Sequence, residues 1–186
     1  MKDRHVLSVL VENRFGELAR VVGLFAGRGF NIDSLAVNVT TDPAFSKIVL
    51  TTRGNDSIVE QIVKQLRKLI RVKKVVEMSD DRYIERELCV ATVQANGPTA
   101  RQELERIVVL TGARVIAYSQ SAFTVEATAS SQQIDDFLEL LRPLGIRDMV
   151  RSAPIAIARP SVEQPADSSR QSTPPSPAPP PLGGVA

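Results

Sequence analysis

The chain has 186 residues, a net charge of +2 and a single cysteine. This length allows one medium domain or two small ones, and the charge is too weak to indicate a nucleic-acid or membrane partner by itself. No segment approaches the roughly 18–20 consecutive apolar residues of a membrane helix, and the N-terminus lacks a signal-peptide core, so we expect a soluble cytoplasmic protein.

The first part of the chain alternates between strand and helix patterns. Strands are predicted from alternating apolar residues, and helices from apolar residues spaced three and four apart. In chain order the segments are a strand at 7–11, a helix at 18–25, strands at 35–39 and 48–52, a helix at 59–70 and a strand at 72–78. This β-α-β-β-α-β order predicts a ferredoxin-like domain over residues 1–79, with both helices on one face of an antiparallel sheet.

The same order recurs after a polar break at 79–82, which we interpret as a linker. The predicted segments are a strand at 87–94, a helix starting at 97–99, strands at 114–118 and 123–127, a helix capped by Ser130 and Ser131 and ended by Gly145, and a final strand from about 147 towards 157. The fold class is therefore α+β, with a second ferredoxin-like β-α-β-β-α-β unit over 83–158.

The C-terminal segment, residues 159–186, has a different composition. Eight of the twelve prolines lie between residues 160 and 186, among Ser, Gln and Gly, with no apolar periodicity. Such a segment cannot bury enough surface to offset the entropy lost on ordering, so we expect a disordered Pro/Ser-rich tail. A proline-rich ligand for another protein is the alternative.

Residue types that perform catalysis are scarce. The only histidine, His5, lies at the start of the first strand, and Cys89 lies in the apolar run 88–91, where we expect a small buried side chain. Neither a Ser-His-Asp nor a Cys-His arrangement can be assembled, and no metal-ligand spacing is present. Gly27-Arg28-Gly29 follows a helix rather than a strand and lacks the third glycine of a dinucleotide fingerprint. We therefore expect no catalytic residues, no metal and no cofactor on this chain.

RNA binding is a known use of ferredoxin-like sheets, and it requires aromatic residues on the central strands. The strands at 6–10 and 48–51 contain none. A cluster of basic residues runs from the second predicted helix into the strand that follows it. It comprises Lys64, Arg67, Lys68, Arg71, Lys73 and Lys74. We interpret it as a solvated outer face and expect no nucleic-acid partner.

One local arrangement can bind a ligand. The first strand ends in Glu12-Asn13-x-x-Gly16 and a helix begins directly afterwards. Free amides and the positive end of the helix dipole favour a carboxylate, and glycine allows a ligand to approach the backbone closely. Asn13 can donate and accept hydrogen bonds, so the turn suits a free amino acid. Equally, Asn13 could merely cap the helix while Gly16 merely permits the turn.

Several stretches resemble one known family. Residues 5–25 read HVLSVLVENRFGELARVVGLF and residues 27–35 read GRGFNIDSL, with further support from EQIVKQLRKLI at 60–70 and from Arg86-Glu87-Leu88. Together they resemble the small, regulatory subunit of acetolactate synthase (acetohydroxyacid synthase). The likeness covers residues 1–158, and the joined motifs carry it, because the fold alone would not define a function.

The resemblance implies that the first unit is an ACT domain and the second the family's C-terminal domain. Two ACT domains are expected to pair as a homodimer, with a branched-chain amino acid, typically valine, at their contact. The implied effector-binding residues are Asn13, Gly16, Glu17 and Leu18 on one protomer, the last two through their amides, and Asn31 and Ile32 on the facing protomer.

The resemblance also implies a partner and a role. The partner is the large catalytic subunit, which condenses two pyruvates or pyruvate with 2-oxobutyrate and carries thiamine diphosphate, Mg2+ and FAD. This chain would stimulate that subunit and mediate feedback inhibition. Phe15 stands where the family often has proline, and Asn38-Val39-Thr40 where it commonly has Gly- or Ala-Pro-Thr. The effector's identity therefore stays open, as do two alternatives: a stand-alone ACT sensor acting on another protein, and an effector-insensitive stabilising paralogue.

Overall fold

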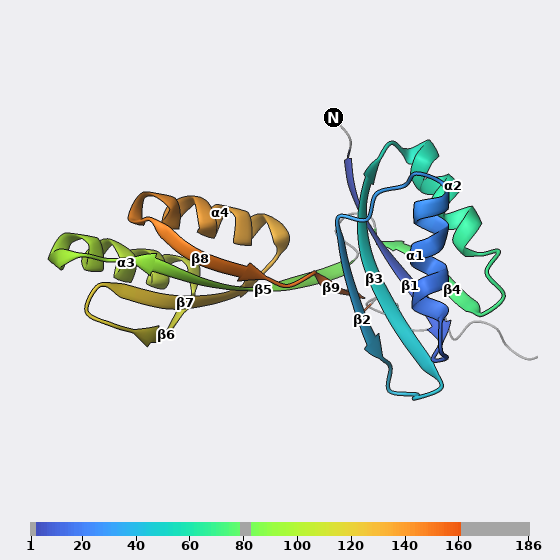
Figure 1. The fold of residues 1–186 in the computed structure, drawn as a ribbon, viewed down its shortest axis with the longest axis horizontal. Coiled ribbons are helices and arrows are strands. Elements are labelled where there is room, and N and C mark those ends of the chain that lie inside the picture. Colours follow the sequence, from blue (N-terminus) through green and yellow to red (C-terminus); the bar gives the residue numbers. More distant parts are fainter. Residues whose placement is uncertain (1–2, 79–82, 161–186) are drawn as a thin grey trace, which may run out of the picture.

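The computed structural model describes residues 3–78 and 83–160. They form two units, each an antiparallel sheet with two helices on one face (Figure 1). The predicted α+β class with two ferredoxin-like units is confirmed. The linker at 79–82 and all but the first two residues of the tail lie outside the described residues, so those predictions stay predictions.

The first unit follows the predicted order. Its elements are β1 (Asp3–Glu12), α1 (Glu17–Gly27), β2 (Ser34–Val39), β3 (Phe45–Gly54), α2 (Asp56–Leu66) and β4 (Val72–Met78). The strand order is β2-β3-β1-β4, so β1 is central and β2 is an edge strand. β1 is paired with β4 only from Val6 to Val11, whereas its pairing with β3 runs along its whole length.

The core of the first unit lies between the sheet and its helices. Alternate residues of β1, such as Leu7 and Val9, face this core and are fully buried, and Phe25 of α1 and Ile62 of α2 cover them. Ile70 was predicted to continue the apolar stripe of the second helix, and this is wrong. The helix α2 ends at Leu66, and Ile70 lies beyond it with its side chain 91% exposed.

The second unit repeats this arrangement. Its elements are β5 (Tyr83–Gln94), α3 (Gly97–Thr111), β6 (Arg114–Tyr118), β7 (Ala122–Ala129), α4 (Ser131–Leu141), the short 3-10 helix η2 (Arg142–Leu144), β8 (Ile146–Arg151) and β9 (Ile155–Ala158). The sheet order is β6-β7-β5-β8. Ser130 and Gln133 form a capping box at the start of α4, as the predicted Ser130 cap requires. Cys89 is fully buried, as predicted, and burial raises the pKa of its thiol.

The last predicted strand is in fact two. β8 ends at Arg151, and β9 begins after Pro154, which cannot donate to a strand ladder. β9 pairs with the first four residues of β5, from Tyr83 to Arg86, and this ribbon extends β5 beyond its predicted start. Ala156 of the ribbon packs on Val6 and Val49, on the face of the first sheet opposite its helices (Figure 1). The two units are therefore joined by packing as well as by the chain.

None of the helices described is long and apolar enough to cross a membrane.

Candidate functional site

The turn between β1 and α1 has the backbone geometry of an anion-binding site. Gly16 adopts the left-handed conformation, with φ 83°, at the N-cap of α1, and no side chain caps this helix. The amides of Leu18 and Ala19 donate to no acceptor in the described part of the chain. Free amides at a helix N-terminus attract negative charge, so the turn offers donors to a carboxylate.

Asn13 does not cap the helix, which removes the alternative role considered for it. Its backbone N–H donates to the carbonyl oxygen of Ala44 (2.8 Å), and its Nδ2 donates to the carbonyl oxygen of Pro43 (3.0 Å). These bonds hold the end of β1 against the loop that leads into β3. Oδ1 of Asn13 makes no hydrogen bond within residues 3–78 and 83–160, and it can accept one from an ammonium group.

Glu17, the first residue of α1, has a buried side chain. It is 3% exposed, and its Oε1 lies 2.9 Å from Nη1 of Arg71 and 3.7 Å from Nε of Arg20. A buried carboxylate is stable only when it is paired and hydrogen-bonded, so Arg71 fixes the first turn of α1 to the start of β4. The amide of Glu17 lies 3.4 Å from the carbonyl oxygen of Arg14, so it is less available to a ligand than the two amides that follow.

Sequence reasoning missed this pair, although a signal for it was present. Glu17 lies four and eight residues before Val21 and Phe25, both buried, so it falls on the buried face of the helix.

Glu12 adds a second ionic contact beside the turn. Its carboxylate is 2.8 Å from Nζ of Lys73, 3.7 Å from Nε of Arg14 and 3.9 Å from Nε of Arg71. The hydrogen bond from Lys73, followed by the nearby positive charges, holds the pKa of Glu12 below its usual value. The turn is thus surrounded by more cations than carboxylates, which favours an anionic ligand. Within the basic cluster, Lys73 is exposed as the interpretation of a solvated face requires, whereas Arg71 departs from it by pairing with the buried Glu17.

Asn31 and Ile32 lie at the opposite end of α1 from Gly16. The intervening helix has 11 residues, a length of roughly 16 Å, so one chain does not bring the two groups together. Nδ2 of Asn31 donates to Oδ1 of Asp33 (2.6 Å), and Ile32 packs partly against the core. Only a second copy can place an Asn31 beside a Gly16.

The surface next to the turn is apolar and unpaired at one edge. Leu18 and Val22 on α1 are 41% and 37% exposed, and Val37 and Val39 on the edge strand β2 are 38% and 56% exposed. Phe15, in the turn itself, is fully exposed. An edge strand beside exposed apolar side chains is a surface suited to pairing with another strand.

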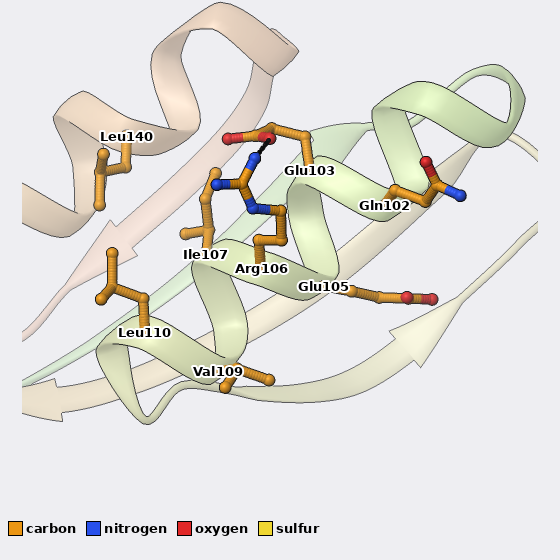
Figure 2. Close-up of a pocket in the computed structure, with 8 residues that line it drawn as sticks. All are labelled: Gln102, Glu103, Glu105, Arg106, Ile107, Val109, Leu110 and Leu140. Carbon is orange, nitrogen blue, oxygen red and sulfur yellow. Dashed lines mark hydrogen bonds and ion pairs between the residues drawn. The ribbon is translucent and has the colours of Figure 1, made fainter.

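A separate hollow lies in the second unit, between α3 and α4 (Figure 2). Its apolar residues Ile107, Leu110 and Leu140 come from both helices, and the Glu103–Arg106 ion pair (3.2 Å) lies at its rim. The hollow contains no helix N-terminus, and none of the predicted effector residues lines it. Arg106, the cation that lines it, is already paired with Glu103.

His5 is less exposed than expected for a terminal histidine. Its side chain is 13% exposed, with Nδ1 2.9 Å from Oε1 of Glu77 and Nε2 3.3 Å from the carbonyl oxygen of Gly54. Within the described ranges, no group of three or more His, Cys, Asp or Glu residues could hold a metal ion.

Comparisons with known proteins fit both units. A family model for the ACT domain of acetohydroxyacid synthase small subunits matches residues 7–74, and a model for the small subunit of acetolactate synthase matches residues 86–160. The chain is 42% identical to a probable acetolactate synthase small subunit from Methanothermobacter thermautotrophicus, over 84% of this chain and 94% of the relative. It is 43% identical to the acetolactate synthase small subunit of Mycolicibacterium smegmatis, over 83% and 91% of the two chains.

A solved structure shows the same architecture. The crystal structure of the acetolactate synthase small subunit from Thermotoga maritima matches with a TM-score of 0.75 and 31% identity, over 86% of this chain and 99% of that one. The fold and the helix-start turn thus define an ACT-type ferredoxin-like module followed by a second ferredoxin-like unit. The chain belongs to the family of acetolactate synthase small subunits.

Proposed function

We propose that this chain is a non-catalytic regulatory subunit that stimulates the large catalytic subunit of acetolactate synthase. It also mediates feedback inhibition by valine or another branched-chain amino acid. Membership of the small-subunit family supports the partner, and the ACT-type unit supports amino-acid binding. The thiamine diphosphate, Mg2+ and FAD of the reaction belong to the large subunit in this proposal.

The turn at Gly16 carries the proposal. The free amides of Leu18 and Ala19 can donate to the effector's carboxylate, and the unpaired Oδ1 of Asn13 can accept from its ammonium group. The cations around Glu12 and Glu17 lower the cost of placing a second anion there. The exposed apolar side chains of Phe15 and Leu18 offer contact to a branched aliphatic side chain.

A homodimer would complete this site. If the β2 strands of two copies pair antiparallel, their α1 helices also run antiparallel, and the start of one lies beside the end of the other. That arrangement covers Val37 and Val39 and brings Asn31 and Ile32 of one protomer to Gly16 of its partner. The separation of the two groups along α1 within one chain supports a shared site.

The regulation follows from that sharing. An effector that contacts both protomers stabilises the dimer arrangement that it binds best, and it can shift activity only through that difference. Couplings of this kind are typically about 1–3 kcal/mol, or roughly 5- to 150-fold in affinity. Such a difference is large enough to change the activity of a catalytic partner.

An activity assay tests the proposal. The purified large subunit is assayed for acetolactate formation alone, with this chain, and with this chain during titration of valine, leucine and isoleucine. We expect stimulation by the chain and partial or full reversal by one of the three amino acids. Stimulation that no amino acid reverses would identify an effector-insensitive stabilising subunit. No stimulation would contradict the proposal and favour a sensor acting on another protein.

A further inference from the structure

The contact between the two units contains a charge cluster that the site does not use. Arg4, at the start of β1, reaches from the first unit into the second. Its Nη2 lies 3.1 Å from Oε2 of Glu85, 2.7 Å from Oγ of Ser131 and 3.8 Å from Oε1 of Glu87. Arg4 thus bonds to the interdomain ribbon and to the start of α4 at once.

The second unit presents a dense set of partners at this point. Glu87 is 4% exposed, accepts from Oγ of Ser131 and Nε of Arg151, and is thereby held in place. The amide of Ser131 donates to Oε1 of Glu85 (3.1 Å), and Nη2 of Arg151 donates to the carbonyl oxygen of Ser131 (3.0 Å). Moving Arg4 therefore changes the balance of charge around a buried carboxylate, which is costly in a low-dielectric surrounding.

A cleft lies beside this charge cluster, and the loop that carries Asn31 helps to line it. Asp33 and Arg53 line it together with Arg4 and Glu87, and Oδ2 of Asp33 is 2.9 Å from Nε of Arg53. Arg53 lies directly opposite Arg4 in the register between β1 and β3. Like charges facing each other across strands destabilise a sheet unless each has its own acidic partner. Here Arg53 has Asp33, and Arg4 has Glu85.

These contacts connect the effector site with the second unit. Asn31 bonds to Asp33, Asp33 pairs with Arg53, and Arg53 neighbours the arginine that holds Glu85. When the Asn31 amide binds an effector in place of Asp33, the Asp33 carboxylate loses that hydrogen bond. It then interacts more strongly with Arg53, its remaining partner. A change in the charge balance at Arg53 then alters the repulsion between Arg53 and its cross-strand neighbour Arg4, and with it the position of Arg4 at Glu85.

We propose an interdomain latch, through which the loop at Asp33 controls how the second unit is held on the ACT sheet. This latch consists of Arg4, Glu85, Glu87, Ser131 and Arg151. That an effector drives this loop rests on the proposed function. The link from Asp33 to Glu85 does not, because it depends only on contacts within one chain.

A double-mutant cycle tests the latch without a ligand. Hydrogen exchange at the Ser131 amide reports on Glu85, and it is measured in the full-length chain as wild type, Asp33→Asn, Arg4→Gln and the double variant. Asp33→Asn keeps the shape of the side chain and removes its charge. We expect this substitution to change exchange at Ser131 about fivefold in the wild-type background and less than about twofold with Arg4→Gln. An equal change in both backgrounds, or none in either, overturns the latch.

Two controls separate the latch from general destabilisation. Arg142→Gln removes another arginine–glutamate pair of the second unit, to Glu139, and should leave the response to Asp33→Asn intact. Glu85→Gln should abolish the response as Arg4→Gln does. Exchange at the fully buried β5 residue Val93, measured in every variant, shows that the second unit stays folded.

Valine is the final probe, and its results separate the latch from the proposed function. If calorimetry shows valine binding, we expect valine to change exchange at Ser131 in the wild type and not in Arg4→Gln. Binding without any change at Ser131 overturns the role of the latch in transmission and leaves the effector site standing. Absence of binding overturns the proposed valine site, and the ligand-free cycle still decides whether Asp33 acts on the second unit.

Discussion

The two ferredoxin-like units begin their first helices differently. Gly16 before α1 has φ 83°, and Gly97 at the start of α3 has φ 82°, so in both units the backbone passes through the left-handed region at this glycine. After Gly16 come Glu17 and Leu18, whereas Pro98 follows Gly97 and has no N–H to donate. Both units thus begin their first helix after a left-handed glycine, and Pro98 removes from the second unit one of the helix-start donors that the first unit keeps.

The buried glutamates show a second difference between the units. Glu17 in the first unit pairs with Arg71 and fixes the helix start that forms the candidate site. Glu87 in the second unit pairs with Arg151 and lies within reach of Arg4, at the contact between the units. The same kind of pair therefore fixes the helix start of the candidate site in one unit and lies at the contact between the units in the other.

The largest expected effect is on valine affinity, and it should distinguish substitutions at the two glycines. Gly16→Asp should weaken valine binding by more than about 100-fold, because a carboxylate in the turn repels that of the ligand. Gly97→Asp should leave binding unchanged. At both positions an added Cβ would meet no atom within 4 Å, and both substitutions cost roughly 1–3 kcal/mol of backbone strain. Calorimetry measures the valine affinities, and thermal unfolding measures the stabilities. Equal losses of valine affinity in the two variants would contradict a site at Gly16.

The paired arginines give the next effect. Arg71→Met leaves Glu17 buried with only Arg20 nearby, and Arg151→Met leaves Glu87 with the more distant Arg4. Each should lower the free energy of unfolding by about 2 kcal/mol, less than for a fully buried pair because both arginines are partly exposed. Denaturant titration measures this cost. Arg71→Met should also weaken valine binding strongly, whereas Arg151→Met should change it by no more than the roughly fivefold coupling expected of the latch. Equal weakening by the two variants would contradict the separate roles.

The edge strands provide a smaller effect. Val39→Lys on β2 should weaken homodimer association at least about tenfold, or roughly 1.4 kcal/mol, because a lysine at the pairing edge must be desolvated. Ile116→Lys on β6, the corresponding edge of the second unit, serves as the matched control and should have little effect. Sedimentation equilibrium over a range of concentrations distinguishes them. A stronger effect at Ile116 would move the dimer contact to the second unit.

The smallest effect is a dependence on pH in the first unit. The pKa of Glu12 is held below the ordinary 4.5, first by the hydrogen bond from Lys73. A depressed folded-state pKa stabilises the protein above the unfolded pKa, and this contribution is lost as the pH falls through the folded value.

Lys73→Met should therefore reduce stability at pH 6–7 and converge with the wild type in acid, well below pH 4.5. Lys68→Met, at a lysine with no ion pair in the described part of the chain, is the control. A difference between Lys73→Met and the wild type that persists unchanged in acid would show that packing, and not the Glu12 charge, is responsible. Thermal unfolding across this pH range makes the comparison.

Periodicity predicted most of the fold, and it is clearest in α1 and α2, whose buried residues lie three and four positions apart. It failed where another contact decides the outcome. Ile70 fits the spacing of α2, but the helix has already ended at Leu66, and the final strand divides at Pro154. The pairing of β9 with the start of β5 was not predictable, because it depends on packing against the other unit at Val6 and Val49.

The candidate site was predicted as a set of positions, and the structure adds the contacts. Gly16 was recognised from its place before a helix, and its left-handed conformation agrees. The role of Arg71 was missed, because a run of basic residues resembles a solvated face and its partner Glu17 lies 54 residues earlier. Long-range charge pairing of this kind leaves no local pattern in the sequence.

The proposal that two copies share one effector site is tested most directly with mixed dimers. Gly16→Asp chains and Asn31→Ala chains are each expected to bind valine poorly as homodimers. In a mixed dimer one site carries both defects, and the other combines an intact Gly16 with an intact Asn31. Calorimetry on the exchanged mixture should therefore recover one strong valine site per mixed dimer. No recovery, once mass spectrometry shows that mixed dimers have formed, would contradict a site built from two copies.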